Sequence, residues 1–279
     1  MNGLDSCASG DSGGSVIDRD LLLAVESIAR RAAEVVMAVY GSDFEVEGKA
    51  DASPVTRADR EAEALIVPAL QALTPHWQVV AEEAVAAGDT PQVGSTFWLV
   101  DPLDGTREFV ARNGEFTVNI ALIRHGMPIL GVVLLPVSSR LYGGWVGHGA
   151  WLDEAGLRRS IHCRAEPAEG ATVACSRSHG DRGAIDGWLG GRDVAGWCSA
   201  GSSLKFGLLA EGRADLYPRF GRTMEWDTAA GHAVLLAAGG SVCTVGGAPL
   251  RYGKPGFENP HFIAAGLPSG SGPPRGVRG

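Results

Sequence analysis

The chain has 279 residues, of which 45% are hydrophobic and 20% charged, and its formal net charge is −8. This length is sufficient for one large or two modest domains with a hydrophobic core. The negative charge argues against non-specific nucleic-acid binding, so we expect no nucleic-acid partner, although bound cations would still admit an anionic substrate. The five cysteines are odd in number, widely spaced and without a CxxC pair, which argues against a disulfide framework or a zinc site and fits a reducing cytoplasm.

The two ends differ in composition from the rest of the chain. Residues 1–17 are rich in Gly, Ser and Asp and lack the basic start and apolar core of a signal peptide, so we predict a disordered extension. Residues 266–279 are rich in Pro and Gly, which predicts a disordered tail. No apolar run reaches the roughly 18 residues of a membrane span. We therefore expect a cytoplasmic protein with a folded part over 18–265, and leave open a peripheral association with the inner face of the membrane.

Two helices are predicted first. From Asp18 to Gly41, apolar side chains recur at the i, i+3, i+4 spacing of a packing helix. A second helix begins where Thr56 and Asp59 have the spacing of a capping box, and Pro68 should kink or break it. Taken alone, Asp59 fits a carboxylate at a helix N-terminus better than a catalytic group.

The motif after the first buried strand carries the most chemistry. An apolar run over 97–100 predicts a short strand that stops at Asp101 and Pro102, because proline cannot donate to the ladder. Asp104 and Gly105 turn the chain again. Two carboxylates at the end of a buried strand are costly unless they are compensated, and a divalent metal is the usual compensation. The backbone N–H groups and the hydroxyl that follow suit a phosphate.

Further strands surround this motif. A short strand over 79–83 ends in Glu82 and Glu83, two acids that resemble the remainder of a metal site. Downstream, apolar runs with turn signals between them predict mostly hairpin-linked strands over 116–123, 129–135, 141–146 and 150–152. Helices followed by a sheet of this kind indicate the α+β class, with an N-terminal α+β part over 18–159 and a C-terminal α/β part over 160–265.

The second region combines short strands with two informative helix starts. Ser202 or Ser203 should cap a helix, and Lys205 in its first turn opposes the helix dipole, which suggests an anion as its purpose but fits a solvated surface lysine about as well. Over 226–240, a run of small residues predicts a helix that packs very closely, with Asp227 at its N-cap and held in the interior. We expect a buried, hydrogen-bonded His232 and not a metal ligand.

Five acids gather at predicted strand ends or helix starts. They are Asp59, Glu82, Asp101, Asp104 and Asp227. All-oxygen ligation points to Mg²⁺ or Mn²⁺, and two ions about 3.5–4 Å apart would clamp a phosphoryl transfer. Thr106, with Asp59 or Glu82, would orient a water and take its proton. The chain has no P-loop, nucleophile elbow or HExxH helix, so hydrolysis of a phosphate ester is the chemistry that uses all these residues.

Two motifs carry a resemblance to a known family. The run Asp101-Pro102-Leu103-Asp104-Gly105-Thr106, with Trp226-Asp227-Thr228-Ala229-Ala230-Gly231 downstream, resembles the paired signatures of the inositol monophosphatase superfamily. These are Mg²⁺-dependent, lithium-sensitive phosphatases with a layered α-β-α-β-α sandwich fold. Within the superfamily the chain looks most like the CysQ-type 3′(2′),5′-bisphosphate nucleotidases, on the runs over 107–120, 176–179, 201–206 and 217–221.

The resemblance implies a role for each matching residue. The metal ligands would be Glu82, Asp101, Asp104, Asp227 and the backbone carbonyl of Leu103, holding about two or three Mg²⁺ ions, or Mn²⁺ in their place. Asp59 and Thr106, together with Glu82, would handle the nucleophilic water. The scissile phosphate would lie against this metal site and the backbone of Leu103, Asp104, Gly105 and Thr106. The nucleotide and its non-reacting phosphate would contact His179, Ser202, Lys205 and Arg219.

The leading functional hypothesis is removal of the 3′-phosphate of adenosine 3′,5′-bisphosphate (PAP) to give AMP. The related phosphosulfate nucleotide PAPS, converted to APS, is a further candidate substrate, and both belong to the recycling of nucleotides in sulfur assimilation. An inositol or sugar monophosphatase is the first alternative, and a non-enzymatic regulatory protein on the same fold is the second. The substrate would be a small molecule, and the chain would act as a monomer or homodimer.

Overall fold

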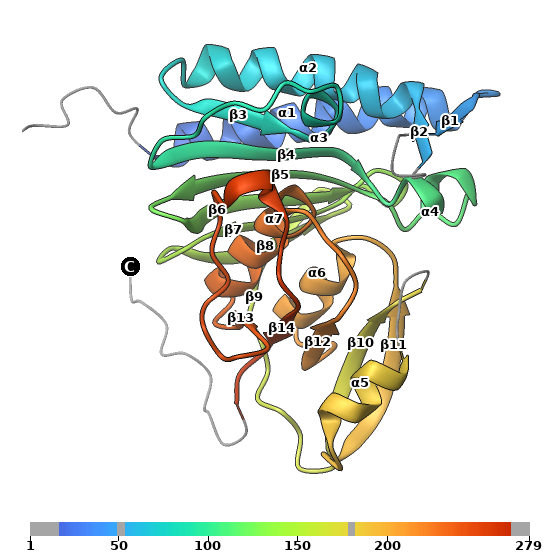
Figure 1. Cartoon of the computed structure of the whole chain (residues 1–279), viewed down its shortest axis with the longest axis vertical. Coiled ribbons are helices and arrows are strands. Elements are labelled where there is room, and N and C mark those ends of the chain that lie inside the picture. Colours follow the sequence, from blue (N-terminus) through green and yellow to red (C-terminus); the bar gives the residue numbers. More distant parts are fainter. Residues whose placement is uncertain (1–16, 49–53, 178–181, 269–279) are drawn as a thin grey trace, which may run out of the picture.

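The structure is a computed structural model, and it describes residues 17–48, 54–177 and 182–268. Its elements stack in five layers (Figure 1). Helices α1 (Arg19–Tyr40) and α2 (Arg57–Leu73) cover one face of a seven-stranded sheet, and α6 (Leu204–Ala210) and α7 (Glu225–Ala237) lie on its other face. A five-stranded sheet and then α5 (Arg182–Leu189) complete the stack. The predicted layered α-β-α-β-α sandwich of the α+β class is confirmed.

The seven-stranded sheet is a meander with the strands in chain order. Its strands are β3 (Gln78–Ala81), β4 (Thr96–Asp104), β5 (Thr117–Arg124), β6 (Met127–Leu135), β7 (Arg140–Trp145), β8 (Gly149–Glu154) and β9 (Leu157–Ile161). Only the β3–β4 pair is parallel. The hairpin-linked strands are therefore confirmed, but β9 was not predicted, because four of its five residues are exposed and only one of these four, Leu157, is apolar. The expected change of region near 160 falls within β9.

The five-stranded sheet has a different order from the chain. Its strands are β10 (Ala171–Ser176), β11 (Val194–Ala200), β12 (Leu216–Arg219), β13 (Ser241–Thr244) and β14 (Phe262–Ala265), arranged β11-β10-β12-β14-β13. The remaining elements are the hairpin β1 (Val46–Gly48) and β2 (Pro54–Thr56), the short helices α3 (Glu82–Ala86) and α4 (Thr106–Val110), and the 3₁₀ turn η1 (Pro255–Phe257).

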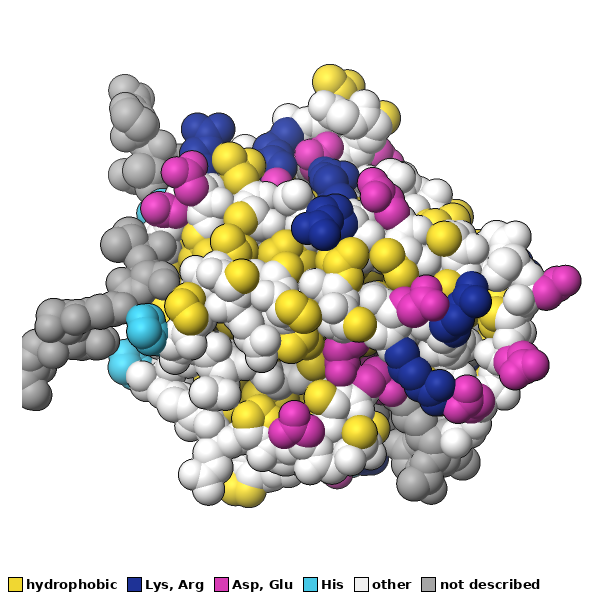
Figure 2. Space-filling model, turned by 90° about the horizontal axis from the view of Figure 1, so that it is seen from above, with side chains coloured by type: hydrophobic (Ala, Val, Ile, Leu, Met, Phe, Trp, Pro, Cys, Tyr) yellow, Lys and Arg dark blue, Asp and Glu magenta, His cyan; other side chains and the backbone are white. Residues whose placement is uncertain are grey.

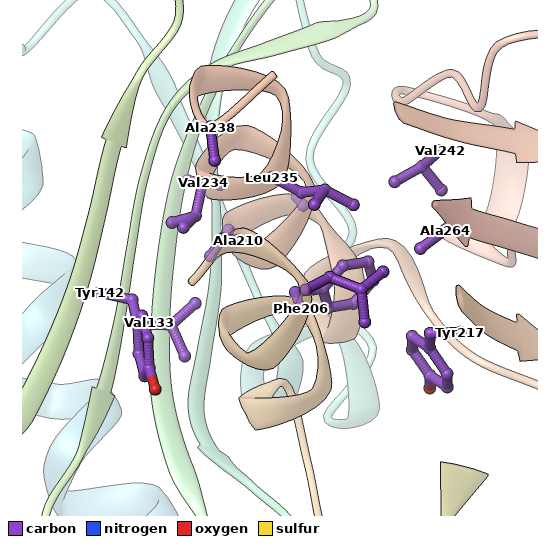
Figure 3. Close-up of a cluster of buried hydrophobic side chains, with 14 of the residues drawn as sticks. Val133, Tyr142, Phe206, Ala210, Tyr217, Val234, Leu235, Ala238, Val242 and Ala264 are labelled. Carbon is purple, nitrogen blue, oxygen red and sulfur yellow. The ribbon is translucent and has the colours of Figure 1, made fainter. Parts of the chain in front are cut away.

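Helix α7 packs between the two sheets at very close range, as its small residues predicted. A Cβ atom on Gly131 of β6 would lie 2.3 Å from the carbonyl oxygen of Ala230, and one on Gly231 would lie 2.4 Å from the ring of Phe206. Figure 3 shows Val234 and Leu235 of α7 in this layer, with Phe206 of α6 beside them. Backbone contact of this kind leaves no room for added side-chain atoms.

Neither Pro68 nor Pro102 ends its element, so the breaks expected at these prolines are wrong. Helix α2 runs through Pro68 without a break. Pro68 and the Ala64 residue whose carbonyl would have been its partner are both exposed, so water can satisfy that carbonyl. Strand β4 likewise continues past Pro102 to Asp104. Its pairing with β5 shifts between Asp101 and Asp104, so the proline lies in a bulge where no ladder bond is required.

Three smaller corrections concern element ends. Strand β3 ends at Ala81, so Glu82 and Glu83 begin α3 instead of closing the strand. The backbone N–H groups of Gly266 and Leu267 donate to neighbouring carbonyls at 2.9 and 3.2 Å, so order continues past the predicted start of the tail. Ile17 packs against the core beside α1. Residues 1–16 and 269–279 of the predicted disordered ends lie outside the described residues.

Surface and bulk features complete the description. The face seen in Figure 2, on the side of α1 and α2, mixes basic and acidic side chains without a patch of one sign. The four cysteines of the described chain are free thiols. Among the described helices, none has the length and apolar character to cross a bilayer.

Candidate active site

A cleft of about 1060 Å³ lies where α2, α3 and the β4 turn face α6, β12 and the start of α7. Ten of the residues predicted from the sequence line it. They are Glu82, Asp101, Leu103, Asp104, Gly105, Thr106, Ser202, Lys205, Arg219 and Asp227. Asp59 contacts this set through Thr106. His179 falls outside the described residues.

Asp59 contacts both the start of α2 and a hydroxyl group of the cleft. It is 1% exposed. Its Oδ2 accepts hydrogen bonds from the backbone N–H and the hydroxyl of Thr56, both at 2.8 Å, which confirms the capping box. Its Oδ1 lies 3.1 Å from Oγ1 of Thr106. One carboxylate therefore fixes the helix start with one oxygen and a cleft hydroxyl with the other.

Asp104 is held on one side only. Its Oδ2 accepts from the backbone N–H of Ser203 at 2.7 Å, the Ser203 hydroxyl at 2.9 Å, Nδ2 of Asn119 at 3.2 Å and the Thr117 hydroxyl at 3.4 Å. Its Oδ1 accepts no hydrogen bond from the described part of the chain. Desolvation raises the pKa of Asp104, and the ammonium of Lys205 opposes that rise. A carboxylate oriented through one oxygen keeps the other for a ligand.

Asp227 shows the same arrangement, at a position that differs from the predicted one. It is the third residue of α7, and Met224 occupies the N-cap. Its Oδ2 accepts from the Met224 N–H at 2.8 Å. Burial and the charges of Asp104 and Glu82 raise the pKa of Asp227 well above its ordinary value.

This donor set fits a hard divalent cation. The side chains offer carboxylate oxygens, and a bound cation would offset the burial that raises the pKa values of Asp104 and Asp227 and the repulsion of Asp227 by Asp104 and Glu82. Within the described ranges, no three His, Cys, Asp or Glu side chains already converge on one point closely enough to hold an ion. The individual ligands therefore remain a prediction.

The turn between Asp101 and Thr106 is fixed by its own hydrogen bonds. Oδ1 of Asp101 accepts the Leu103 N–H at 3.0 Å, so this N–H is already engaged within the turn. Gly105 has a φ of 90°, and a Cβ atom there would lie 2.1 Å from Oγ of Ser202. Both the positive φ and the close approach of Ser202 therefore require glycine at this position. The backbone N–H groups in the first turn of α4 remain as donors for an anion.

Lys205 is not a solvated lysine. It is 3% exposed. Its Nζ donates to the carbonyls of Ala200 at 3.1 Å and Ser202 at 2.5 Å, and lies 5.2 Å from the centre of the Tyr217 ring. Burial lowers the pKa of Lys205 to about 8, while Asp104 acts in the opposite direction. An ammonium has three N–H donors, so one remains for an anion in the cleft.

Among the residues near Lys205, Ser203 differs from its expected role as a helix cap. Ser203 occupies the N-cap of α6 without capping it, because its hydroxyl lies 2.9 Å from Oδ2 of Asp104 and 2.7 Å from the carbonyl of Asp227. Ser202 contacts the carbonyl of Asp104 through its hydroxyl at 2.8 Å. Arg219 is partly buried at the end of β12 and donates to the Arg222 carbonyl at 3.3 Å.

Sequence reasoning missed several side chains that support the site. Asn119 and Ser203 hold Asp104, and Glu63 contacts the start of α3. Glu225, which is 0% exposed, accepts from the N–H groups of Gly253 and Lys254 and so holds a distant segment against the start of α7. A polar Asn inside an apolar strand was a usable signal, whereas the partner of Glu225 was not visible from local spacing.

His232 matches its prediction. It is 1% exposed, and its Nδ1 lies 2.9 Å from the hydroxyl of Tyr252. Burial lowers the pKa of His232 to about 3. The ring is therefore neutral and structural.

A model of the inositol monophosphatase family matches residues 18–267. The chain belongs to this family. It is 49% identical to the 3′(2′),5′-bisphosphate nucleotidase CysQ of Escherichia coli K12 over 238 residues, which are 84% of this chain and 95% of the relative.

Solved structures of the family agree with the fold. The crystal structure of CysQ from Bacteroides thetaiotaomicron, a bacterial member of the family, is similar with a TM-score of 0.77 and 38% identity, covering 90% of this chain and 99% of that one. The Thermotoga maritima IMPase is similar with a TM-score of 0.73 and 26% identity, covering 89% and 92% of the two chains.

Proposed function

We propose that this chain is a Mg²⁺-dependent 3′(2′),5′-bisphosphate nucleotidase that hydrolyses the 3′-phosphate of PAP to give AMP and phosphate. The observation that carries the proposal is the cleft itself, in which carboxylates of the β4 turn and α7 face Lys205 and Arg219. The near half-identity to curated CysQ nucleotidases supports the substrate class. PAPS as a second substrate, and a role in sulfur assimilation, are extensions of the same proposal.

The chain's own residues would prepare the attacking water. Oγ1 of Thr106 lies 3.1 Å from Oδ1 of Asp59 and 3.3 Å from the Leu103 carbonyl, and a hydroxyl that donates to Asp59 keeps its lone pairs for a water. A water that donates to this oxygen would pass its proton toward Asp59 as it attacks the phosphorus. Burial of Asp59 keeps the pair in one geometry.

Glu82, Asp101, Asp104, Asp227 and the Leu103 carbonyl would hold Mg²⁺, or Mn²⁺ in its place. When bound, such ions supply an acidified water and neutralise charge on the scissile phosphate. The first turn of α4 and Gly105 would receive the phosphate oxygens. The expected number of about two or three ions is part of the proposal.

Lys205, Arg219, Ser202 and His179 would bind the nucleotide and its non-reacting phosphate. A cation within hydrogen-bonding range of that phosphate positions the reacting ester through remote binding energy. The remaining N–H donor of Lys205 and the guanidinium of Arg219 suit a second phosphate better than an uncharged ring hydroxyl. This charge favours the nucleotidase over the inositol or sugar monophosphatase alternative.

The test is a comparison of rates on the purified chain with Mg²⁺. We expect release of phosphate from PAP to have a higher kcat/KM than release from inositol 1-phosphate, and we include PAPS beside them. Much faster turnover of inositol 1-phosphate would overturn the nucleotide assignment, and no turnover of any of the three would favour the non-enzymatic alternative. Lithium should inhibit at saturating Mg²⁺. The cytoplasmic location and the monomeric or dimeric state stay predictions.

A further inference from the structure

Helix α3 lacks a cap of its own. It begins at Glu82, follows the N-cap residue Ala81, and receives no side-chain hydrogen bond from that residue. The first N–H groups of any helix have no partner inside the helix, and alanine cannot supply one. The first N–H groups of α3, which lie at the cleft, must therefore find their hydrogen-bond acceptors outside the helix.

The missing cap comes from α2. Oε2 of Glu63 accepts the N–H of Glu83 at 2.8 Å, and Oε1 accepts the N–H of Ala84 at 2.8 Å. Glu63 is 8% exposed, so the accepting side of these two bonds is largely removed from solvent. Both oxygens of one carboxylate thus hold consecutive N–H groups directly after Glu82, which favours one orientation of the first turn.

Glu63 itself is firmly placed. On either side of it, Ala62 and Ile66 of α2 are 0% exposed in the core beneath α1 and β4. Asp59, one helical turn earlier, holds Thr106. The two carboxylates are four residues apart and so share one face of α2, from which they reach two different walls of the cleft.

We propose that Glu63 is a positioning residue that sets the metal affinity of the site by fixing Glu82. The inference rests on the proposed function, in which Glu82 binds Mg²⁺. Glu63 acts through the backbone of α3, and its loss leaves the nucleotide contacts of Lys205 and Arg219 untouched. Supporting groups of this kind typically change metal affinity or activity by about 10–100-fold.

The test is Glu63→Gln in the full-length chain. The amide has nearly the shape of the carboxylate, but its NH₂ group cannot accept, so one of the two hydrogen bonds is lost. We expect the Mg²⁺ concentration for half-maximal activity to rise about tenfold, with kcat at saturating Mg²⁺ and the KM for PAP within about threefold of the parent. A second readout without turnover is Mn²⁺ binding followed by electron paramagnetic resonance, in which the Kd should rise in parallel.

Glu61→Gln is the matched control. Glu61 lies on the same helix, its side chain is 48% exposed, and its Oε1 lies 3.2 Å from Nε of Arg57 on the surface. Its substitution should leave the Mg²⁺ and Mn²⁺ responses unchanged.

Four outcomes separate the inference from the proposed function. Loss of metal affinity in Glu63→Gln and in Glu82→Gln supports both. Loss in Glu82→Gln with an unchanged Glu63→Gln overturns the positioning role alone. An unchanged metal response in Glu82→Gln overturns the ligand assignment beneath it. A lower melting temperature of Glu63→Gln with unchanged Mn²⁺ binding would mean that Glu63 is merely structural, and this also overturns the inference.

Discussion

The acidic and the cationic side of the cleft are built differently. On the acidic side, Asp59, Asp104 and Asp227 each use a carboxylate oxygen for hydrogen bonds to nearby backbone or hydroxyl groups. On the cationic side, Lys205 is buried against two carbonyls, and Arg219 is partly buried at a strand end. The acidic side is therefore preorganised for one chemistry, while the cationic side presents the N–H donors that would distinguish one substrate from another.

Asp104→Asn tests the acidic side with the largest expected effect. The amide keeps the shape but removes the charge that a divalent cation requires. The activation free energy should therefore rise by several kcal/mol, which lowers kcat/KM by at least about 10³-fold. The measurement is phosphate release from PAP and from a small monoester, both of which should fall together. Retained activity at ordinary Mg²⁺ would remove the assigned role of the acidic side.

Arg219→Ala tests the cationic side. Loss of a charged hydrogen bond to the non-reacting phosphate should cost about 1.5–3 kcal/mol, which raises the KM for PAP about 10–100-fold. A small monoester lacks that phosphate, so its kinetics should stay within about threefold. Equal losses on both substrates would show that the two sides are not separable. Lys205→Ala is the weaker probe, because removing a buried side chain also lowers stability.

Ser203→Ala sharpens the comparison at the boundary between the sides. The variant loses the hydroxyl that lies near Asp104 and the Asp227 carbonyl, but keeps the Ser203 N–H on Asp104. We expect the Mg²⁺ requirement to rise about tenfold with little change in the KM for PAP. A change in the KM for PAP alone would assign Ser203 to the cationic side.

The pH dependence of stability that His232 causes tests the scaffold behind both sides of the cleft. We expect His232 to affect stability and not turnover. Its pKa is lowered to about 3 in the folded chain, so its contribution is present above the unfolded value near 6.5 and is lost as the pH falls toward 3. Between pH 7 and pH 5 the loss should be about 2 kcal/mol. Denaturant melts should show this loss, and it should be smaller in His232→Gln. The exposed His76→Gln is the control and should melt like the parent at both values.

Local periodicity explains which parts of the fold were predictable. Helix α1 and strands β4 to β8 carry apolar patterns that are complete within each segment, so they were found. Strand β9 is an edge strand with exposed residues and has no such pattern. The breaks expected at Pro68 and Pro102 failed because exposure and a bulge removed the need for the missing N–H. Tertiary context decided both cases.

The site follows the same division. Asp101, Asp104 and Asp227 were predicted because acids beside buried segments need compensation, whatever the fold. Ser203, Asn119 and Glu63 were not assigned to the site, because their importance depends on which distant segment they meet. Lys205 was placed correctly at the cleft, but the carbonyls that surround it come from the end of β11 and from the loop before its own helix, and they were not foreseen.

The close approach of α7 to β6 has a consequence for how the cleft keeps its width. Asp104 ends β4 of the seven-stranded sheet, and Asp227 lies in α7. The gap between the two carboxylates therefore depends on how closely α7 approaches that sheet. At Gly131 that layer is backbone against backbone, since a Cβ atom there would lie 2.3 Å from the carbonyl of Ala230. A single added methyl group would push two layers apart and move carboxylates that it does not touch. The spacing of the reacting groups is thus determined in part by a position where a side chain is absent.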